Sequence, residues 1–417
     1  MPRVLLLPGD GIGPEVTAEA RAVLELLAPD LEFEEALIGG CAIDAEGAPI
    51  SDATVARAKE CGLVLLGAVG GPKWDSLESD QRPEKGLLRI RKELELYANL
   101  RPAAVLPALI NASSLKPERV EGVDLIVIRE LTGGLYYGQP KGRCDEGSLR
   151  KSRNTMVYDE NEIARIACVG FETARRRRGL LTNIHKANVL DVCVLWNEVV
   201  EEVAKDYSDV RLEHQLVDSA AMVLLRDAQS FDVLLCPNLF GDIISDEAAE
   251  LTGSLGMLPS ASVGDGGRGL FEPVHGSAPD IAGQDKANPL AAILSAAMLL
   301  EHGLDRPEPA AAIRAAAEKV LDQGLRTGDL AGPRDTLVGC REMGARLREV
   351  LGGCARSLPA WVCSERPARL ATSCCVCWTT ARCRSASCAS SPVWQVRGAN
   401  STFAATRSSS RRRTARI

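Results

Sequence analysis

The sequence predicts an α/β protein with helices on both faces of its sheets. Short apolar runs, typical of buried strands, end in glycine-rich turns, and residues with helical periodicity follow. The first unit begins with Val4–Leu7, passes through Gly9-Asp-Gly-Ile-Gly13 and enters a helix at Pro14, which suits the first helical position. A second apolar run, Gly62–Gly67, also ends in a glycine-rich turn. In open α/β sheets, ligands bind at such strand ends.

The central part of the chain continues this alternation. The clearest helix start follows Asp159, because Asp159 and Glu162 resemble a capping box and the apolar residues after them recur at helical spacing. We predict three further strands, one helix and the start of another, in the order Leu125–Arg129, Leu180–Ile184, Val189–Lys205 (helix), Val233–Cys236 and Asn238 onward (turn into helix).

Composition and charge narrow the function classes. The 417 residues are 46% hydrophobic and 25% charged, close to globular averages, and no apolar run is long enough to span a membrane. The residues after Gly353 hold eleven Arg against one acid and carry +10, so with the whole chain at −7 the first 353 residues carry −17. This acidic balance argues against nucleic acid as a partner of the main body.

The N-terminus does not resemble a signal peptide, and we expect a cytoplasmic protein.

The segment 354–417 differs in composition from the rest of the chain. It holds seven of the fourteen Cys, no His, and no helical or strand periodicity. Zinc binding there is disfavoured because the segment offers no His partner. We predict that residues 354–417 are a foreign, disordered extension. The other seven Cys are scattered singly, as is typical of reduced, buried thiols.

Three arginines are candidates for binding a carboxylate. Arg91 lies on a predicted helix, Arg101 precedes a proline, and Arg129 ends a predicted strand. At the C-terminal end of a strand, a guanidinium can point into the ligand-facing crevice and grip a carboxylate with two hydrogen bonds. We favour this interpretation of Arg129 over that of a surface charge.

Asp242 and Asp246 are the candidate metal ligands. They lie four residues apart, so on a helix both carboxylates face the same side, where like charges destabilise the helix. A divalent cation such as Mg²⁺ or Mn²⁺ would remove this repulsion, and Asp218, at the end of an apolar strand, could supply a third carboxylate. The alternative is an exposed acidic helix face.

Other motifs are weak when taken singly. The Gly9–Gly13 turn fits a phosphate-binding loop and a tight turn with positive φ angles equally well. Lys186 and Tyr136 lie at strand ends or glycine turns, where an amine or phenol can exchange protons with a ligand. Asp280 could accept a hydrogen bond from an adenosine ribose, which would favour NAD over NADP.

Taken together, these segments resemble the isocitrate/isopropylmalate dehydrogenase family over about residues 1–350. The matching segments are Leu6–Glu15, Gly67–Trp74, Gly86–Arg91, Tyr97–Pro102, Arg129–Tyr136, Lys186–Leu190, Asn238–Ile243, Glu272–Gly283 and Ala287–Pro289. The resemblance implies two α/β domains with an active site in the cleft between them, in a fold that is not a Rossmann fold. Residues 1–98 plus 254–353 would form the NAD-binding domain, and 99–253 the domain for dimerisation, metal and substrate.

The resemblance also implies how a small 2-hydroxy dicarboxylate substrate binds. Arg91, Arg101 and Arg129 would hold its carboxylates. Asp242 and Asp246 would hold Mg²⁺ or Mn²⁺.

The partner subunit of a homodimer would complete the site. Its Asp218 would contact the metal and the substrate, and its Lys186 would take the proton from the C2 hydroxyl. Tyr136 would then protonate the product of decarboxylation.

NAD is the cofactor that the resemblance implies. Asp280-Ile281 stands where NADP-dependent relatives are expected to carry a basic and an aromatic residue. The positions that match NAD-contacting residues of the family are Ile12, Glu84, His275, Gly276, Ser277, Ala278, Pro279, Asp280 and Asn288.

The substrate branch is inferred from the residues before Arg91. Leu87 and Leu88 offer an apolar surface suited to an isopropyl group, which favours oxidative decarboxylation of 3-isopropylmalate in leucine biosynthesis. Asn183-Ile-His-Lys186, Ser219 and Pro237 depart from that branch and leave D-malate or tartrate as alternative substrates. A catalytically silent NAD-binding subunit would lack one of the catalytic Arg, Lys or Asp residues, and none is missing.

Overall fold

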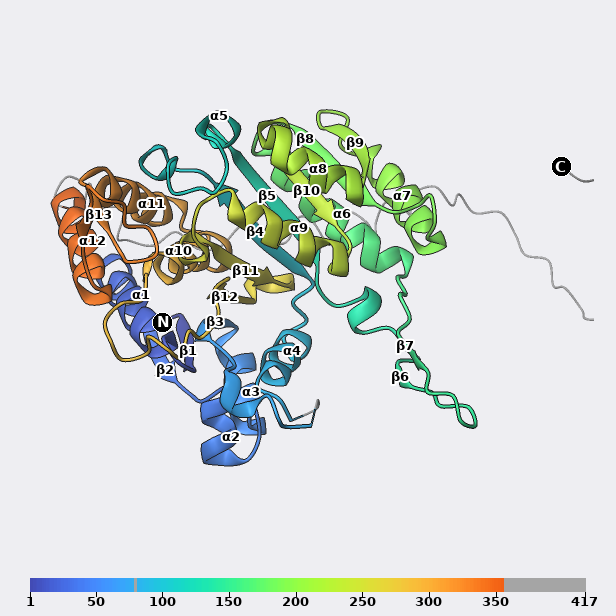
Figure 1. The fold of residues 1–417 in the computed structure, drawn as a ribbon, viewed down its shortest axis with the longest axis horizontal. Coiled ribbons are helices and arrows are strands. Elements are labelled where there is room, and N and C mark those ends of the chain that lie inside the picture. Colours follow the sequence, from blue (N-terminus) through green and yellow to red (C-terminus); the bar gives the residue numbers. More distant parts are fainter. Residues whose placement is uncertain (79–80, 356–417) are drawn as a thin grey trace, which may run out of the picture. The chain divides into compact units, whose positions relative to one another are not determined.

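The computed structural model describes residues 1–78 and 81–355, which belong to one compact unit of mixed α/β structure (Figure 1). The predicted α/β class is confirmed.

The predicted extension at 354–417 overlaps the last helix, which runs to Ala355, and its remainder lies outside the described residues. Within the described ranges, no helix combines the length and apolarity needed to cross a membrane, and the seven Cys of the main body are free thiols.

Strands and helices alternate in the segments for which the sequence predicts alternation. The strands are β1 (Arg3–Gly9), β2 (Glu32–Glu35), β3 (Leu63–Ala68), β4 (Ala98–Ala104), β5 (Asp124–Glu130), β6 (Gly142–Arg143), β7 (Ser152–Arg153), β8 (Leu180–His185), β9 (Arg211–Leu216), β10 (Val233–Cys236), β11 (Pro259–Val263), β12 (Gly269–Pro273), β13 (Leu325–Arg326) and β14 (Thr336–Leu337). The helices are α1 (Gly13–Leu27), α2 (Gly40–Glu46), α3 (Asp52–Cys61), α4 (Glu84–Glu93), α5 (Pro117–Val120), α6 (Glu160–Arg175), α7 (Asp191–Ala204), α8 (Val217–Asp227), α9 (Asn238–Glu250), α10 (Leu290–Met298), α11 (Pro307–Asp322) and α12 (Cys340–Ala355). By contrast, β6 and β7, and likewise β11 and β12, follow each other without an α-helix between them.

Ten strands form one sheet in the order β2-β1-β3-β12-β11-β4-β5-β10-β8-β9. The pairings are parallel at both ends of the sheet, whereas β12/β11, β11/β4 and β4/β5 are antiparallel. In Figure 1, β11 and β12 accordingly lie between β3 and β4, although they come from a much later part of the chain. A sheet with an antiparallel centre is not the all-parallel sheet of a Rossmann fold, as expected.

Several strands of the sheet, among them β1 and β10, are buried on both faces. Successive residues of a strand point to opposite faces, and Val4, Leu5, Leu6 and Leu7 of β1 are each at most 2% exposed. The four residues of β10 are fully buried as well. On one face of β10, Leu234 and Cys236 join an apolar cluster with residues of α8 and α9. This two-sided burial explains why these strands appear in the sequence as continuous apolar runs.

Local signals in the sequence place most element boundaries correctly. Asp159 caps α6 through the predicted capping box, in which the Glu162 carboxylate accepts from the Asp159 backbone N–H. The prediction for Asp218 is wrong in one respect: β9 ends at Leu216, so Asp218 lies in the first turn of α8 rather than at the end of a strand. A carboxylate in the first turn of a helix is stabilised by the helix dipole. The apolar run before Asp218 was too short for its periodicity to show that a helix had begun.

The division into two domains stays a prediction. The sheet order is consistent with it, because five adjacent strands come from 1–98 and 254–353 and the other five come mainly from 99–253. Two apolar clusters follow the same pattern: one is built from residues between Ala103 and Leu258, the other from residues between Leu5 and Leu96 together with Leu270.

The antiparallel centre of the sheet carries a row of polar side chains on one face. Directly paired residues of neighbouring strands point to the same side, and Asn99 pairs with Arg129 on β5 and with Ser262 on β11. Asn99 donates to the hydroxyls of Ser260 and Ser262 at 2.9 and 3.1 Å. Arg101 stands two residues further along β4 and so shares this face. The topology therefore gathers polar side chains on one face of the antiparallel centre of the sheet.

The Gly9–Gly13 turn is a tight turn with positive φ angles. Gly9 and Gly11 have φ values of +72° and +58°. A Cβ on Gly11 would lie 1.9 Å from the carbonyl oxygen of Ser277, and the next N–H, that of Ile12, donates to the same oxygen at 2.8 Å. The glycines thus allow the turn to contact the loop that follows β12.

We expect Gly11→Ala to lower the free energy of unfolding by about 3 kcal/mol, because backbone strain adds to overpacking. Gly47→Ala is the matched control: φ there is +76°, but a Cβ would meet nothing within 4 Å. Backbone strain alone predicts a loss of about 1 kcal/mol for it. Urea denaturation of both variants measures the difference, and equal losses would contradict the role of the Ser277 contact.

Candidate active site

A cavity of about 510 Å³ lies against the polar centre of the sheet. Its walls come from the end of β3, from α4, from β4 and β5 with the loop after β5, from α9, and from β11 and β12. The structure brings ten of the predicted site residues to this cavity: Glu84, Leu87, Leu88, Arg91, Arg101, Arg129, Tyr136, Asp242, His275 and Gly276.

Arg129 is the most deeply buried cation of the cavity, at 3% exposure. Its Nε and Nη2 donate to Asn238 Oδ1 at 3.1 and 2.8 Å, and its Nη1 donates to Asp242 Oδ1. Burial lowers the pKa of Arg129 to about 10, while the nearby Asp242 carboxylate opposes that shift. The guanidinium is therefore charged at neutral pH and held in a fixed orientation at the cavity wall.

Arg101 lies between the two candidate metal ligands. Its Nη1 donates to Asp246 Oδ1 at 2.9 Å, and its Nη2 is 3.7 Å from Asp242 Oδ1. Asp242 and Asp246 are on successive turns of α9, as predicted, and the Asp246 side chain is 64% exposed. Contacts with Arg101 and Arg129 offset the repulsion between these carboxylates. Asp242 and Asp246 thus both contact one positive charge, the Arg101 guanidinium.

Arg91 forms an ion pair with Glu272, which the sequence did not identify as a site residue. Its Nη2 donates to Glu272 Oε1 at 2.6 Å, and both side chains are at most 10% exposed. The Nε of Arg91 is buried without a hydrogen-bond partner. A buried donor without an acceptor is costly unless a ligand satisfies it. Arg91 lines the cavity, and its ion pair with Glu272 holds its guanidinium there.

Tyr136 joins the same cluster from the loop after β5. Its hydroxyl donates to Asp242 Oδ2 at 2.7 Å. Partial burial and the Asp242 carboxylate raise the pKa of Tyr136 to about 12. The phenol is therefore protonated throughout the neutral pH range and can act as a proton donor.

An apolar wall stands beside the arginines. Leu87 and Leu88 of α4 line the cavity together with Val69 and Leu131. Gly86 permits close packing of this helix, because a Cβ there would lie 2.6 Å from the Pro49 carbonyl oxygen. The cavity thus combines three cations with a nonpolar surface on one side.

Lys186 and Asp218 do not line this cavity. Instead, Lys186 Nζ donates to Asp218 Oδ1 at 2.6 Å, joining the turn after β8 to the start of α8. The hydrogen bond from Lys186 lowers the pKa of Asp218. The pair therefore forms a separate charged cluster in the single chain, and its role in a shared site stays a prediction.

The predicted cofactor residues fall into two groups. Glu84, His275 and Gly276 line the cavity, whereas Ile12, Ser277, Ala278, Pro279 and Asp280 belong to the adjoining loop region. His275 Nε2 is buried without a partner, and burial lowers the pKa of this imidazole. Asp280 is exposed, while Asn288 is buried and donates to Asp329 Oδ2 at 3.0 Å.

Three polar residues of the site were missed from the sequence. Glu272 and Asn238 lie inside matching segments, but only their long-range contacts with Arg91 and Arg129 reveal what they do. Asn99, fully buried, orients Arg101 by accepting from its Nε at 2.9 Å. Alternation within β4 was the one signal that could have placed Asn99 and Arg101 on the same face.

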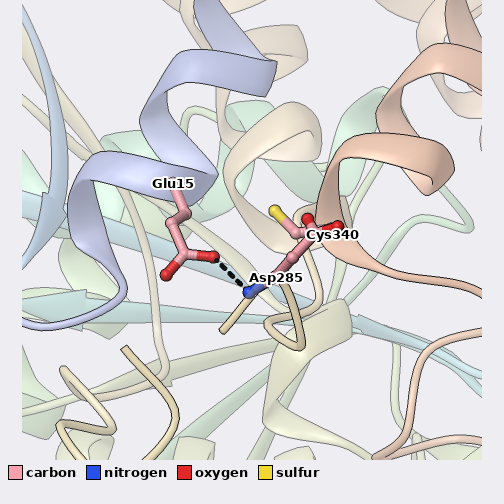
Figure 2. Close-up of side chains that lie close together, drawn as sticks. All are labelled: Glu15, Asp285 and Cys340. Atoms are coloured by element: carbon pink, nitrogen blue, oxygen red, sulfur yellow. Dashed lines mark hydrogen bonds between the residues drawn. The ribbon is translucent and has the colours of Figure 1, made fainter. Parts of the chain in front are cut away.

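A different cluster contains groups that often bind metals. Glu15, Asp285 and Cys340 place ligand atoms within 4.8 Å of one another (Figure 2). Both carboxylates already accept backbone N–H groups, those of Gly283 and Asp285 for Glu15 and that of Arg341 for Asp285. Burial, reinforced by nearby acids, raises the pKa of Cys340 to about 12, which disfavours the thiolate that metals bind. This cluster therefore ties α1 to the start of α12.

The sequence as a whole matches known dehydrogenases. The model of the isocitrate/isopropylmalate dehydrogenase family matches residues 3–347. A 3-isopropylmalate dehydrogenase from Synechocystis is 60% identical over 353 residues, covering 84% of this chain and 98% of the relative. One from Hahella chejuensis is 55% identical over 354 residues, with coverage of 84% and 98%.

Solved structures share the fold. The crystal structure of an isocitrate dehydrogenase from Methylococcus capsulatus aligns with a TM-score of 0.75 at 34% identity, covering 84% of this chain and 99% of that one. A β-decarboxylating dehydrogenase from Thermococcus kodakarensis aligns with a TM-score of 0.71 at 32% identity, with coverage of 88% and 100%.

We expect Asp242→Asn to lower the pKa of Tyr136 from about 12 without returning it to the ordinary value, because partial burial is the larger cause of the shift. Ultraviolet titration of tyrosinate, with Tyr136→Phe subtracted, measures this pKa. Asp246→Asn is the control, since Asp246 contributes least among the causes and forms no bond to the phenol. An unchanged pKa in Asp242→Asn would contradict the hydrogen bond.

Proposed function

Because the chain belongs to the isocitrate/isopropylmalate dehydrogenase family, we propose that it catalyses the NAD-dependent oxidative decarboxylation of 3-isopropylmalate to 4-methyl-2-oxopentanoate and CO₂ in leucine biosynthesis. The observation that carries this proposal is the cavity in which three arginines face an apolar wall. A dicarboxylate with a branched aliphatic group is complementary to both surfaces.

Substrate binding follows from the two surfaces. Arg91, Arg101 and Arg129, which all line the cavity, bind the carboxylates. Leu87 and Leu88 contact the isopropyl group, where a more polar substituent would lose favourable burial.

The carboxylates of Asp242 and Asp246 are suited to binding a divalent metal ion. Asp242 and Asp246 offer hard carboxylate oxygens, and both already contact the Arg101 guanidinium, so their geometry accommodates a positive charge between them. Asp218 of a second subunit supplies a further oxygen. When bound, Mg²⁺ or Mn²⁺ supplies positive charge beside the substrate oxygen at C2.

Two residues move protons in the proposed reaction. Lys186 of the partner subunit takes the proton from the C2 hydroxyl, and Tyr136 protonates the carbon left by the departing CO₂. The raised pKa of Tyr136 supports the second role, because the phenol still holds its proton at neutral pH.

NAD, when bound, accepts the hydride that leaves C2. Glu84 and His275 lie on the cavity wall toward the loop after β12, and Asp280 is exposed in that loop. A carboxylate at this place accepts from a ribose hydroxyl and repels a 2′-phosphate, which favours NAD over NADP.

A homodimer would bring Lys186 and Asp218 to the cavity of the other chain. Apolar side chains on α8 and α9 support this assembly, since Met222, Leu225 and Ile243 are 52%, 48% and 56% exposed. An exposed apolar face on packed helices is typical of a subunit interface.

The direct test is NADH formation by the purified protein with Mg²⁺, comparing 3-isopropylmalate, D-malate, tartrate and isocitrate. We expect the highest kcat/KM with 3-isopropylmalate, loss of activity with EDTA, and recovery with excess Mg²⁺ or Mn²⁺. A higher value with D-malate or tartrate would move the protein to that branch of the family. No turnover by a folded protein that binds NAD would favour the silent subunit.

Shared active sites predict complementation between inactive variants. Lys186→Ala and Arg101→Ala subunits, each inactive alone, should recover about a quarter of the wild-type activity per subunit when unfolded and refolded together. Half of the randomly formed dimers are mixed, and each mixed dimer has one intact site. The control is each variant refolded separately. Absence of recovery, with mixed dimers demonstrated by mass spectrometry, would contradict a site shared between subunits.

A further inference from the structure

A chain of hydrogen-bonded side chains connects the interior of the protein to the peptide after Lys186. It begins at Trp196, which is fully buried in α7, and passes through Asn183, Asn197 and His185. The donor–acceptor distances are 2.7 Å for Trp196 Nε1 to Asn183 Oδ1, 2.8 Å for Asn183 Nδ2 to Asn197 Oδ1, 3.2 Å for Asn197 Nδ2 to His185 Nδ1, and 3.1 Å for Ala187 N to His185 Nδ1.

The groups at the two ends fix the direction of every hydrogen bond in this chain. The indole Nε1–H of Trp196 can only donate, so the oxygen of Asn183 faces it and the amide nitrogen faces Asn197. The backbone N–H of Ala187 can also only donate, so His185 Nδ1 must be an acceptor. The network is therefore self-consistent only if His185 carries its proton on Nε2.

A second histidine branches from the same network. Asn183 Nδ2 lies 3.1 Å from His214 Nδ1, and His214 Nε2 lies 3.5 Å from Glu201 Oε1. The rings of His185 and His214 are 5.8 Å apart in an edge-to-face arrangement. Burial lowers the pKa of both histidines, with a further lowering of His185 by His214 and an opposing effect of Glu201 on His214. Neutral imidazoles with an acceptor Nδ1 are thus favoured near pH 7.

The peptide group between Lys186 and Ala187 is held from both sides. Its N–H donates to His185 Nδ1, and its carbonyl accepts from the backbone N–H groups of Val189 and Leu190 at 3.1 and 3.0 Å. Because β8 holds the backbone up to His185, fixing the next peptide plane as well restricts the direction in which the Lys186 side chain leaves the backbone. The Lys186 ammonium then lies 2.6 Å from Asp218 Oδ1.

We propose that His185 is a positioning residue for Lys186, with its Nδ1 acting as the acceptor that holds the Lys186–Ala187 peptide in the catalytic orientation. The proposal rests on the proton-accepting role of Lys186 in the proposed function. It assigns a purpose to the Asn183-Ile-His185 segment: Asn183 and Asn197 hold the imidazole so that Nδ1 faces the peptide.

The network can be tested in the wild-type protein without any assay of activity. The chain contains four His, so ¹⁵N-labelled imidazole signals can be resolved and assigned by single substitutions. We expect His185 and His214 to carry protons on Nε2 and none on Nδ1 at pH 7.5. A proton on His185 Nδ1 would overturn the proposal, because this nitrogen could then accept from neither Asn197 nor Ala187.

Substitutions of His185 test the positioning role itself. An Asn side chain places its oxygen near the position of Nδ1, whereas Gln places its amide near Nε2, and Leu offers no acceptor. We expect His185→Gln and His185→Leu to lower kcat about tenfold or more with little change in KM, since small misplacements of a catalytic group are costly. His185→Asn should stay within about threefold of the wild type.

The outcomes separate this proposal from the proposed function. Equal losses in the Asn and Gln variants, or no loss in either, would show that Nδ1 does not position Lys186. A wild-type protein that turns over none of the 2-hydroxy acids would contradict the proposed function, and the imidazole spectra would still decide whether His185 holds the peptide. Circular dichroism and sedimentation confirm that each variant folds and keeps the assembly of the wild type.

Discussion

The ion pair between Arg129 and Asp242 holds together the elements that form the cavity. A buried charge is tolerated when it is paired and hydrogen bonded, and Arg129 satisfies this condition through Asp242 and Asn238. Asn238 also donates to the carbonyl of Gly133, so β5, the loop after it and the first turn of α9 meet at one guanidinium. Removing either partner would leave an uncompensated charge in the wall and disturb all three elements.

The charged side chains around Arg129 and Asp242 also suit the cavity to both anionic and cationic ligands. Asp242 contacts Arg129, Arg101 and Tyr136, and Asp246 contacts Arg101. In the proposed function, a substrate carboxylate would bind the arginines, and a cation would bind the carboxylates that the arginines release. Each charge would then exchange one partner for another, which avoids the cost of leaving a buried charge unpaired.

The sequence predicts the elements well and the contacts between remote residues poorly. Apolar runs locate β5, β8 and β10 because both faces of these strands are buried, and the Asp159 capping box locates α6 because it acts within one turn. The role of Glu272 could not be predicted from such local patterns, because its partner Arg91 lies 181 positions away in the sequence. The contact also depends on β12 pairing with β3 in the sheet. The distance of Asp218 from the cavity is likewise set by tertiary structure.

The pairing of Lys186 with Asp218 also suits a site that is completed by assembly. Each side chain is partly exposed in the single chain, at 24% and 60%, so the pair contributes little stability there. Burying a single charge at an interface is expensive, but a preformed pair enters with its charges already neutralised. The imidazole of His185 acts on the backbone of this pair and leaves the ammonium free of rigid contacts other than Asp218. In the proposed function, Lys186 would therefore exchange Asp218 for a substrate hydroxyl without rearrangement of the turn that carries it.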